Sequence, residues 1–304
     1  MLKRIKPDEI HLGMFIEAID GNWKGQRFWR SRFLLASPEE ADALRASRVE
    51  WVVINTEKGT DVAFADVKAR CPSAEAQLTR ALKTVEQSKP LIKSIFEDAR
   101  DGNSLPIDVA MQVVDDIEAC MRDSSQALIQ VTRLKARDEY TFLHSIAVAA
   151  LMIHFGRSIK MTDATVKELA LGGLLHDVGK MKIPPEILQK SGPLTDAEMI
   201  TVRQHPQNSF EILSRHGNIS EAVLDICLHH HERTDGKGYR DGLLGEEIRP
   251  QVRIASICDV YDALTSRRAY KKAWTSDDAV KFMLKQEGQF DRVLLRNFFY
   301  GMKF

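Results

Sequence analysis

The spacing of hydrophobic and polar positions changes about sixty residues into the chain. Before that point, β-branched and aromatic residues gather in short runs separated by polar turns, as is typical of β-strands. The runs lie at 14–19, 28–35 and 51–54. Between the last two, Ser37 suits a helix cap, Pro38 suits the first turn and two acids follow. The pattern predicts a small α/β domain over residues 1–60.

Helical spacing begins after a polar stretch at 56–72, which we interpret as a linker. From Ser73 the apolar residues recur every three or four positions, and Pro90 is expected to kink or end this first helix. A second helix is predicted over 106–129. Apolar stripes of this kind are more often core, or the seam of a homodimer, than a ligand site. We therefore assign residues 61–136 to a linker and packing helices.

The remaining sequence is expected to be helical throughout. The predicted helices lie at 139–155, 162–176, 195–216, 219–231, 251–266, 276–284 and 290–299. No internal repeat, glycine-rich phosphate loop or nucleophile elbow is visible among them. The sequence thus predicts an α+β protein overall, in which an all-α domain over 137–304 follows the small α/β domain.

Composition and charge narrow the classes of function. The chain has 43 basic and 43 acidic residues, so no overall field favours nucleic acid, and attraction for an anion must be local. The charged N-terminus lacks the apolar centre of a signal peptide, and no apolar run approaches the roughly 20 residues that span a bilayer. The four cysteines are scattered, which is typical of buried thiols in a reducing compartment. We expect a cytoplasmic protein that neither inserts into a membrane nor binds nucleic acid.

One stretch, Leu171–Lys180, joins an apolar helix to an adjacent His-Asp pair, His176 and Asp177. Neighbouring residues on a helix point about 100° apart, so the two side chains reach one ion only from opposite sides of a cleft. This arrangement suits a carboxylate that bridges two metals while the imidazole binds one of them. Taken alone, such a pair is more often an ordinary charge pair at a helix end.

Further ligand candidates follow at the spacing of successive helices. Five histidines lie on the apolar faces or ends of four predicted helices, and two aspartates accompany them: His144, His176, His205, His230, His231, Asp177 and Asp259. A lone buried histidine is more often a core residue than a ligand, but this many together favour a metal site. Imidazole and carboxylate without thiolate suit iron or manganese, and zinc less well. Two divalent ions about 3.5–4 Å apart could share Asp177 and a hydroxide nucleophile.

Lys180 lies one helical turn past His176. Beside a metal site it would neutralise charge on a phosphate or protonate the leaving oxygen. The alternative is a cation that stabilises the C-terminus of a helix. Given the other ligand candidates, we favour the catalytic role for Lys180, together with Asp177.

The spacing of these motifs resembles the HD-GYP family. The match rests on His176-Asp177 with Lys180, on His205-Pro206, on the run from His230-His231-Glu232 to Gly238-Tyr239, and on the run from Asp259 to Ser266. It covers about residues 137 to 292. Members are cyclic di-GMP phosphodiesterases of the wider HD metallohydrolase superfamily, so the resemblance implies an HD-type helical catalytic domain. The first sixty residues look like the small uncharacterised domain that often precedes it.

The resemblance also implies roles for individual residues. One metal would be surrounded by His144, His176, Asp177 and Asp259, and the other by Asp177, His205, His230 and His231. Tyr239, Arg268 and Lys271 occupy the positions that contact the dinucleotide in the family. Beside the other ligand candidates, the basic residues at 267–272 could hold phosphates by charge-assisted bonds, whereas without those candidates a solvated helix end is the default interpretation. Diguanylate cyclase (GGDEF) proteins are the partners that the family's loop implies.

Three positions depart from the family pattern. Arg240 stands where the family's Gly-Tyr-Pro signature has proline, which frees the loop backbone, adds a charge and bears on partner docking. Tyr140 stands where trinuclear members have a glutamate ligand, so two metals are expected rather than three. The sequence ends at Phe304, where members usually continue, so a terminal helix or strand is expected to be missing.

Our leading hypothesis is a metal-dependent phosphodiesterase that linearises cyclic di-GMP to pGpG, and the sequence leaves open whether GMP is the final product. Two alternatives remain open. One is a catalytically weak or inactive module that binds cyclic di-GMP or a protein partner without turnover. The other is an HD hydrolase that acts on a different phosphoester.

Overall fold

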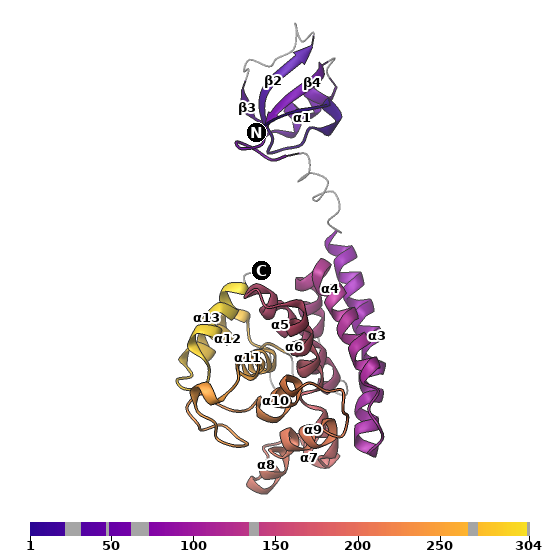
Figure 1. Ribbon diagram of the computed structural model, residues 1–304, viewed down its shortest axis with the longest axis vertical. Coiled ribbons are helices and arrows are strands. Elements are labelled where there is room, and N and C mark those ends of the chain that lie inside the picture. Colours follow the sequence, from indigo (N-terminus) through magenta and orange to yellow (C-terminus); the bar gives the residue numbers. More distant parts are fainter. Residues whose placement is uncertain (22–31, 47–48, 62–72, 134–139, 267–272, 303–304) are drawn as a thin grey trace. The chain divides into compact units, whose positions relative to one another are not determined.

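A computed structural model describes residues 1–21, 32–46, 49–61, 73–133, 140–266 and 273–302. The chain divides into two compact units, Met1–Pro72 and Ser73–Phe304, and each unit has its own hydrophobic core. Strands occur in the first unit, and the second consists of helices, so the expected α+β class is confirmed (Figure 1). The proposed divisions after residues 60 and 136 stay predictions.

In its described residues, the N-terminal unit is an antiparallel sheet with one α-helix. Its elements are β1 (Leu2–Ile5), η1 (Pro7–Glu9), β2 (Phe15–Gly21), β3 (Phe33–Leu34), α1 (Pro38–Arg45) and β4 (Val49–Asn55), with strand order β1-β4-β2-β3. Ile16, Val52 and Ile54 are fully buried, which explains why these apolar runs form the central strands. The charged strand β1 was not expected from the sequence, because Lys3 and Arg4 interrupt its apolar pattern.

Two long helices open the second unit. α3 (Ala74–Asp101) and α4 (Ile107–Arg133) lie side by side (Figure 1). α3 continues through Pro90, so of the two expectations for this proline, an end of the helix is wrong and a kink stays a prediction. The position is exposed, where a missing N–H leaves a carbonyl that water can satisfy. α4 instead breaks at Ser124, whose backbone is non-helical (φ −150°, ψ 42°).

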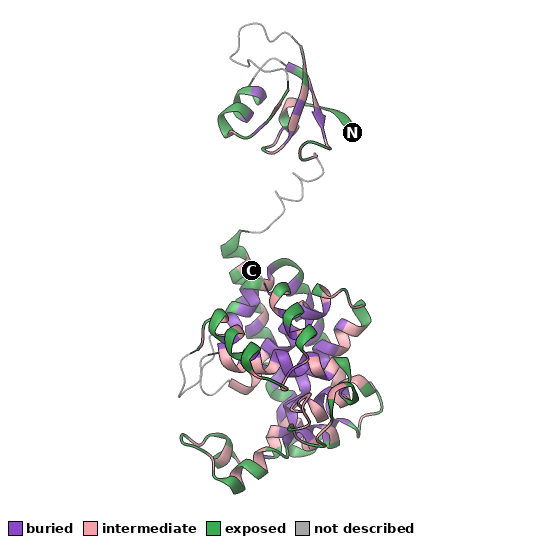
Figure 2. Ribbon diagram, turned by 90° about the vertical axis from the view of Figure 1, so that its left-hand side faces the viewer, coloured by how far each residue is buried: buried purple, intermediate pink, exposed green. Residues whose placement is uncertain are grey.

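The centre of the second unit consists of α5 (Tyr140–Ser158) and α6 (Asp163–Leu175). α5 is buried along most of its length and α6 over its second half, as expected of apolar helices covered by neighbours, and Figure 2 shows the buried residues gathered in the interior of this unit. The surrounding elements are η3 (Val178–Lys182), α7 (Pro185–Leu188), α8 (Asp196–Val202), α9 (His205–Leu213), α10 (Glu221–His229), η4 (Gly245–Glu247), α11 (Pro250–Thr265), α12 (Ser276–Lys285) and α13 (Arg292–Gly301). None of the helices in the described part of the chain is long and apolar enough to cross a bilayer.

The single helix expected over 195–216 is wrong, because the chain forms two helices there. α8 ends at Val202, and α9 starts at His205 with Pro206 in its first turn. Proline favours the first turn of a helix, since its missing N–H has no helical partner there. The restart matters for the site, because it places His205 at the beginning of a helix rather than inside one.

The hairpin of α3 and α4 also touches the segment that follows the His-Asp pair. Lys182 Nζ donates to the carbonyl of Arg100 (2.9 Å), and the Leu105 N–H donates to His216 Nε2 (3.3 Å). The end of α3 and the loop after it therefore support η3 and the end of α9.

Gly179 allows η3 and α9 to approach closely. A Cβ at this position would lie 2.1 Å from the carbonyl oxygen of His205 and 2.4 Å from the nitrogen of Ser209. The nearby Ser209 hydroxyl donates to the carbonyl of His176 (2.8 Å) and accepts from the Gly179 N–H (2.9 Å). Glycine is thus required where the segment after the His-Asp pair meets the helix that carries His205.

We predict that Gly179→Ala destabilises the protein by about 1–3 kcal/mol, since the clash is with backbone atoms that cannot move independently. Thermal or denaturant unfolding would measure the loss. Gly192→Ala is the matched control, because nothing lies within 4 Å of a Cβ there. Equal stability of the two variants would contradict the packing argument.

Candidate metal centre

His176 and Asp177 lie just beyond a helix rather than within it. α6 ends at Leu175, His176 is its C-cap, and Asp177 begins η3 with φ −99° and ψ 5°. Both side chains are almost fully buried, at 2% and 1% exposure. The change of backbone direction turns the two side chains toward one interior point from neighbouring positions.

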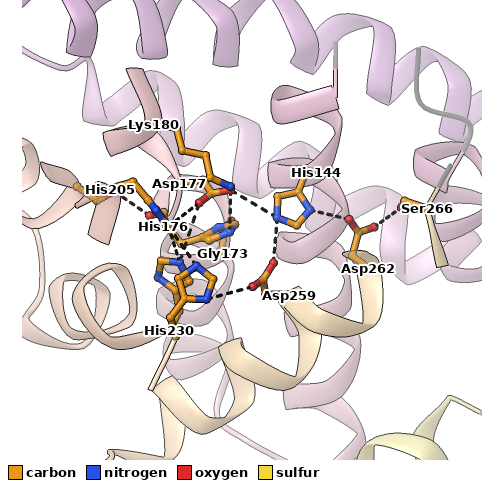
Figure 3. A network of polar contacts seen from close by, with 12 residues as sticks. His144, Gly173, His176, Asp177, Lys180, His205, His230, Asp259, Asp262 and Ser266 are labelled. Carbon is orange, nitrogen blue, oxygen red and sulfur yellow. Dashed lines mark hydrogen bonds and ion pairs between the residues drawn. The ribbon is translucent and has the colours of Figure 1, made fainter. Parts of the chain in front are cut away.

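The two oxygens of Asp177 face different groups of side chains (Figure 3). Oδ1 lies 3.3 Å from His205 Nε2 and 4.0 Å from His230 Nε2. Oδ2 lies 3.4 Å from His176 Nε2, 3.6 Å from His144 Nε2 and 2.5 Å from Lys180 Nζ. The carboxylate therefore stands between two sets of imidazoles.

Asp259 completes the cluster from α11. Its Oδ1 lies 3.0 Å from His144 Nε2, and its Oδ2 lies 4.0 Å from His231 Nδ1. Ligand atoms lie within 4.8 Å of one another in each of three groups: His144, His176 and Asp259; His205, His230 and His231; and His176, Asp177 and His230. The structure thus brings together all seven ligand candidates, from α5, the end of α6, α9, the end of α10 and α11.

Backbone carbonyls orient three of the imidazoles. The Nδ1 atoms of His176 and His205 lie 2.8 and 2.7 Å from the carbonyls of Gly173 and Val202, and His230 Nδ1 lies 3.1 Å from that of Cys227. A carbonyl only accepts, so each Nδ1 carries the proton when the ring is neutral. The Nε2 lone pairs of these rings therefore point into the cluster.

Asp262 orients His144 in the same way. Its Oδ2 lies 2.6 Å from His144 Nδ1, and its Oδ1 accepts from the Ser266 hydroxyl (2.8 Å), as Figure 3 shows. Carboxylates that hold the far nitrogen of a ligating histidine fix its tautomer and raise its basicity. Our sequence analysis gave Asp262 no role, although its position three residues after Asp259 places both on one helix face.

Burial keeps three imidazoles neutral. It lowers the pKa of His205 to about 3 and that of His231 to about 4, and it lowers the pKa of His230 well below its usual range. Neutral imidazole is the form that binds a metal. These side chains are therefore available as ligands without first losing a proton.

Asp177 and His176 each shift the pKa of the other. Burial opposes ionisation of Asp177, but His176 and Lys180 outweigh it and hold the pKa of Asp177 well below its usual range. Burial lowers the pKa of His176, but the Asp177 and Asp259 carboxylates outweigh it and raise that pKa. A bound cation beside Asp177 would take over the role of the charged imidazole.

Bound metal ions explain the positions of the imidazole and carboxylate atoms better than hydrogen bonds alone do. His205 Nε2 lies 3.2 Å from His230 Nε2, and both carry lone pairs because both Nδ1 atoms hold the protons. Two lone pairs at that distance repel unless a cation lies between them. Among the described residues, His176 Nε2 and Asp177 Oδ1 are buried without a hydrogen-bond partner, which is costly in an interior. The clusters are thus able to bind metal.

A loop after α10 borders the cluster and is held by two side chains. The buried Glu232 accepts from the N–H groups of Asp241, Gly242 and Leu243 (2.6, 2.9 and 3.2 Å). His229 lies between Asp225 and Asp241, at 2.6 and 3.0 Å. The role of Glu232 was not anticipated from the sequence, where it is one more charged residue.

Tyr239 and the exposed Arg240 lie in this loop. The Tyr239 ring stacks on His231, with centroids 4.7 Å apart. Arg240 donates to Gln207 on α9 and pairs with Asp241 (3.5 Å). The expected freedom at Arg240 is therefore restricted by side-chain contacts in place of a proline ring.

Three further positions were singled out from the sequence. Arg268 and Lys271 lie outside the described residues. Tyr140 lies against His144, with ring centroids 5.7 Å apart, so its ring packs on that imidazole.

Together the helical fold and the shared buried carboxylate define a metallohydrolase of the HD type. A family model for the HD domain matches residues 117–294, and a model for a domain of unknown function (DUF3391) matches residues 2–110. The chain belongs to the HD domain family, and its motifs place it in the HD-GYP group.

Relatives and a solved structure agree with this assignment. The chain is 41% identical to Cyclic di-GMP phosphodiesterase PA4108 of Pseudomonas aeruginosa, over 98% of this chain and 76% of that protein. It is 35% identical to 3'3'-cGAMP-specific phosphodiesterase 1 of Vibrio cholerae, over 52% of this chain and 37% of that protein. The HD-GYP protein Bd1817 of Bdellovibrio bacteriovorus has the same fold, with a TM-score of 0.60, 15% identity and 98% coverage of both chains.

We predict that Asp262→Ala lowers metal affinity about 10- to 100-fold, because His144 loses the group that orients it. Metal titration monitored by calorimetry would measure the change. Asp277→Ala, an exposed carboxylate in the first turn of α12, is the control and should bind metal as the parent does. Unchanged affinity in Asp262→Ala would contradict the orienting role of Asp262.

Proposed function

We propose that this chain is a metal-dependent phosphodiesterase that hydrolyses cyclic di-GMP, first to pGpG and then to GMP. The observation that carries the proposal is the division of the two Asp177 oxygens between two groups of imidazoles. A carboxylate placed in this way suits a bridge between two ions. The names of relatives such as the Pseudomonas protein support the choice of substrate.

The ligand assignment follows the two groups. We assign one ion to His144, His176, Asp177 and Asp259, and the other to Asp177, His205, His230 and His231. Burial raises the pKa of the Cys227 and Cys258 thiols, so these nearby sulfurs stay protonated and do not compete as ligands. Nitrogen and oxygen ligands without thiolate support iron or manganese.

When bound, the two ions supply Lewis-acid activation of water and of the phosphodiester. The protein's own groups then do the rest. Asp177 and Asp259 lower the net positive charge of the site, and their oriented imidazole partners keep the site rigid. Lys180, one quarter exposed and beside Asp177, is placed to give a proton to the departing 3′ oxygen.

Substrate contacts are proposed on the open side of the cluster. Tyr239 lies against His231 there, and burial raises the pKa of its hydroxyl, so it stays a hydrogen-bond donor. We keep Arg268 and Lys271 as proposed phosphate contacts on the strength of the family motif alone.

Location and partners are part of the same proposal. We propose a cytoplasmic protein, and the free buried thiols Cys120, Cys227 and Cys258 support a reducing compartment. We also propose a homodimer, supported by Leu78 and Leu82, which are exposed one turn apart on α3. Light scattering would test it, and pull-down with GGDEF proteins would test docking at the loop of Arg240.

The main competing function is binding of cyclic di-GMP without turnover. Arg240 in place of proline favours it, and the complete set of metal ligands argues against it. Chromatography of a reaction at saturating metal decides between them. Linear product supports hydrolysis, whereas bound but intact nucleotide supports the receptor.

We predict that Asp177→Ala loses metal and lowers kcat/KM for cyclic di-GMP by more than about 100-fold. Removing a residue that only hydrogen-bonds to a metal ligand already lowers metal affinity or activity about 10- to 100-fold, so removing a ligand should cost more. Elemental analysis and product chromatography would measure the two effects. Asp116→Ala, an exposed carboxylate on α4, is the control. Full turnover in Asp177→Ala would overturn the assignment.

We predict that Lys180→Met lowers kcat for cyclic di-GMP by about 10²- to 10⁴-fold while metal content is kept. The loss should be much smaller for bis(p-nitrophenyl) phosphate, whose leaving group departs without a proton. Steady-state kinetics on both substrates would show the contrast. Lys182→Met is the control, since this lysine bonds the carbonyl of Arg100 instead. Equal losses on the two substrates would exclude proton donation by Lys180.

A further inference from the structure

The metal ligands do not explain how a base is selected. Related phosphodiesterases of similar identity to this chain are named for cyclic di-GMP and for 3'3'-cGAMP, which differ in one base. The ligands are nearly all buried and face the cluster, where a phosphate would lie. Selection of the base therefore requires a side chain outside the cluster but within reach of it.

Arg203 meets this requirement by position. It is the C-cap of α8, two residues before His205, and its guanidinium carbon lies 5.2 Å from the centroid of the Tyr239 ring. That ring is 4.7 Å from the ring of His231, so the guanidinium lies within about 10 Å of a metal-ligand candidate. One nucleotide covers such a span between its phosphate and its base.

Arg203 also differs from the nearby basic residues, because each of those is paired with a carboxylate. Lys180 pairs with Asp177, Arg233 with Asp235 and Arg240 with Asp241. Arg203 is exposed, and within the described residues no carboxylate pairs with its guanidinium. An unneutralised cation at the mouth of this site is suited to an acceptor on the ligand.

The aromatic contact favours a base over a phosphate. The Arg203 guanidinium carbon lies over the Tyr239 ring, and a guanidinium held against an aromatic face can still donate from its N–H groups. Guanine presents two acceptors, O6 and N7, to such a fork, whereas adenine presents the N6 amino donor beside N7. His231 and Arg203 both already contact the Tyr239 ring.

We propose that Arg203 binds the guanine edge of the cyclic dinucleotide and sets base specificity. The proposal rests on the proposed function. Arg203 then contacts the base, whereas the phosphates lie at the metal site and at the other proposed phosphate contacts.

The test compares the parent with Arg203→Ala and Arg203→Lys on three substrates. For cyclic di-GMP, kcat/KM should fall about 5- to 150-fold in Arg203→Ala, which corresponds to the loss of one bidentate pair. Arg203→Lys should recover little, because an ammonium lacks the planar fork. Cyclic di-AMP and the base-free bis(p-nitrophenyl) phosphate should be hydrolysed as by the parent.

Arg215→Ala is the matched control, an exposed arginine just past the other end of α9. An equal loss on cyclic di-GMP and cyclic di-AMP would assign Arg203 to a phosphate and overturn the proposal. Loss of metal, or of activity on the base-free substrate, would assign it a structural role and overturn it as well.

If the parent hydrolyses no cyclic dinucleotide, the proposed function fails, but calorimetric binding still tests Arg203. The ratio of affinities for cyclic di-GMP and cyclic di-AMP should then fall in Arg203→Ala by the same factor. An unchanged ratio would overturn the role of Arg203 independently of turnover.

Discussion

The structure of the second unit depends on one buried charge. Asp177 is 1% exposed, and removing a carboxylate from water costs several kcal/mol unless strong partners compensate. Lys180 and the surrounding imidazoles provide that compensation without metal, and two cations would provide more. Because both oxygens need partners, the chain must bring α5, α9, α10 and α11 to the end of α6. The need to compensate the charge of Asp177 therefore determines both how these helices pack and which groups form the site.

The imidazole rings are held in fixed orientations by hydrogen bonds to their Nδ1 atoms, on the side away from the cluster. Carbonyls at the ends of helical turns hold Nδ1 of His176, His205 and His230, and Asp262 does the same for His144. Each of these rings is thus fixed before any ion arrives, which lowers the entropy lost on binding. Glu232 plays a similar part for the loop of Tyr239, since one carboxylate satisfies three backbone donors.

The sequence predicted the class of fold, and it singled out seven candidate ligands that the structure brings together, because both leave local signals. Histidines on apolar helix faces stand out against an otherwise hydrophobic pattern, and helical spacing is readable residue by residue. The helix expected through His205 was wrong because a break of two residues has no strong signal beyond Pro206. The roles of Asp262, Ser209 and Glu232 were missed because each depends on contacts made only after folding. Arg203 likewise became a candidate through its contact with Tyr239.

The ligand candidates extend from His144 to Asp259, so the centre forms only when most of the second unit has folded. Such a site does not exist in the unfolded chain, and every ion that it binds shifts the folding equilibrium by mass action. Metal supply in the cell would then govern how much of this protein is folded and resistant to proteases as well as how fast it turns over. The amount of folded protein and its activity would therefore both follow the supply of the metal.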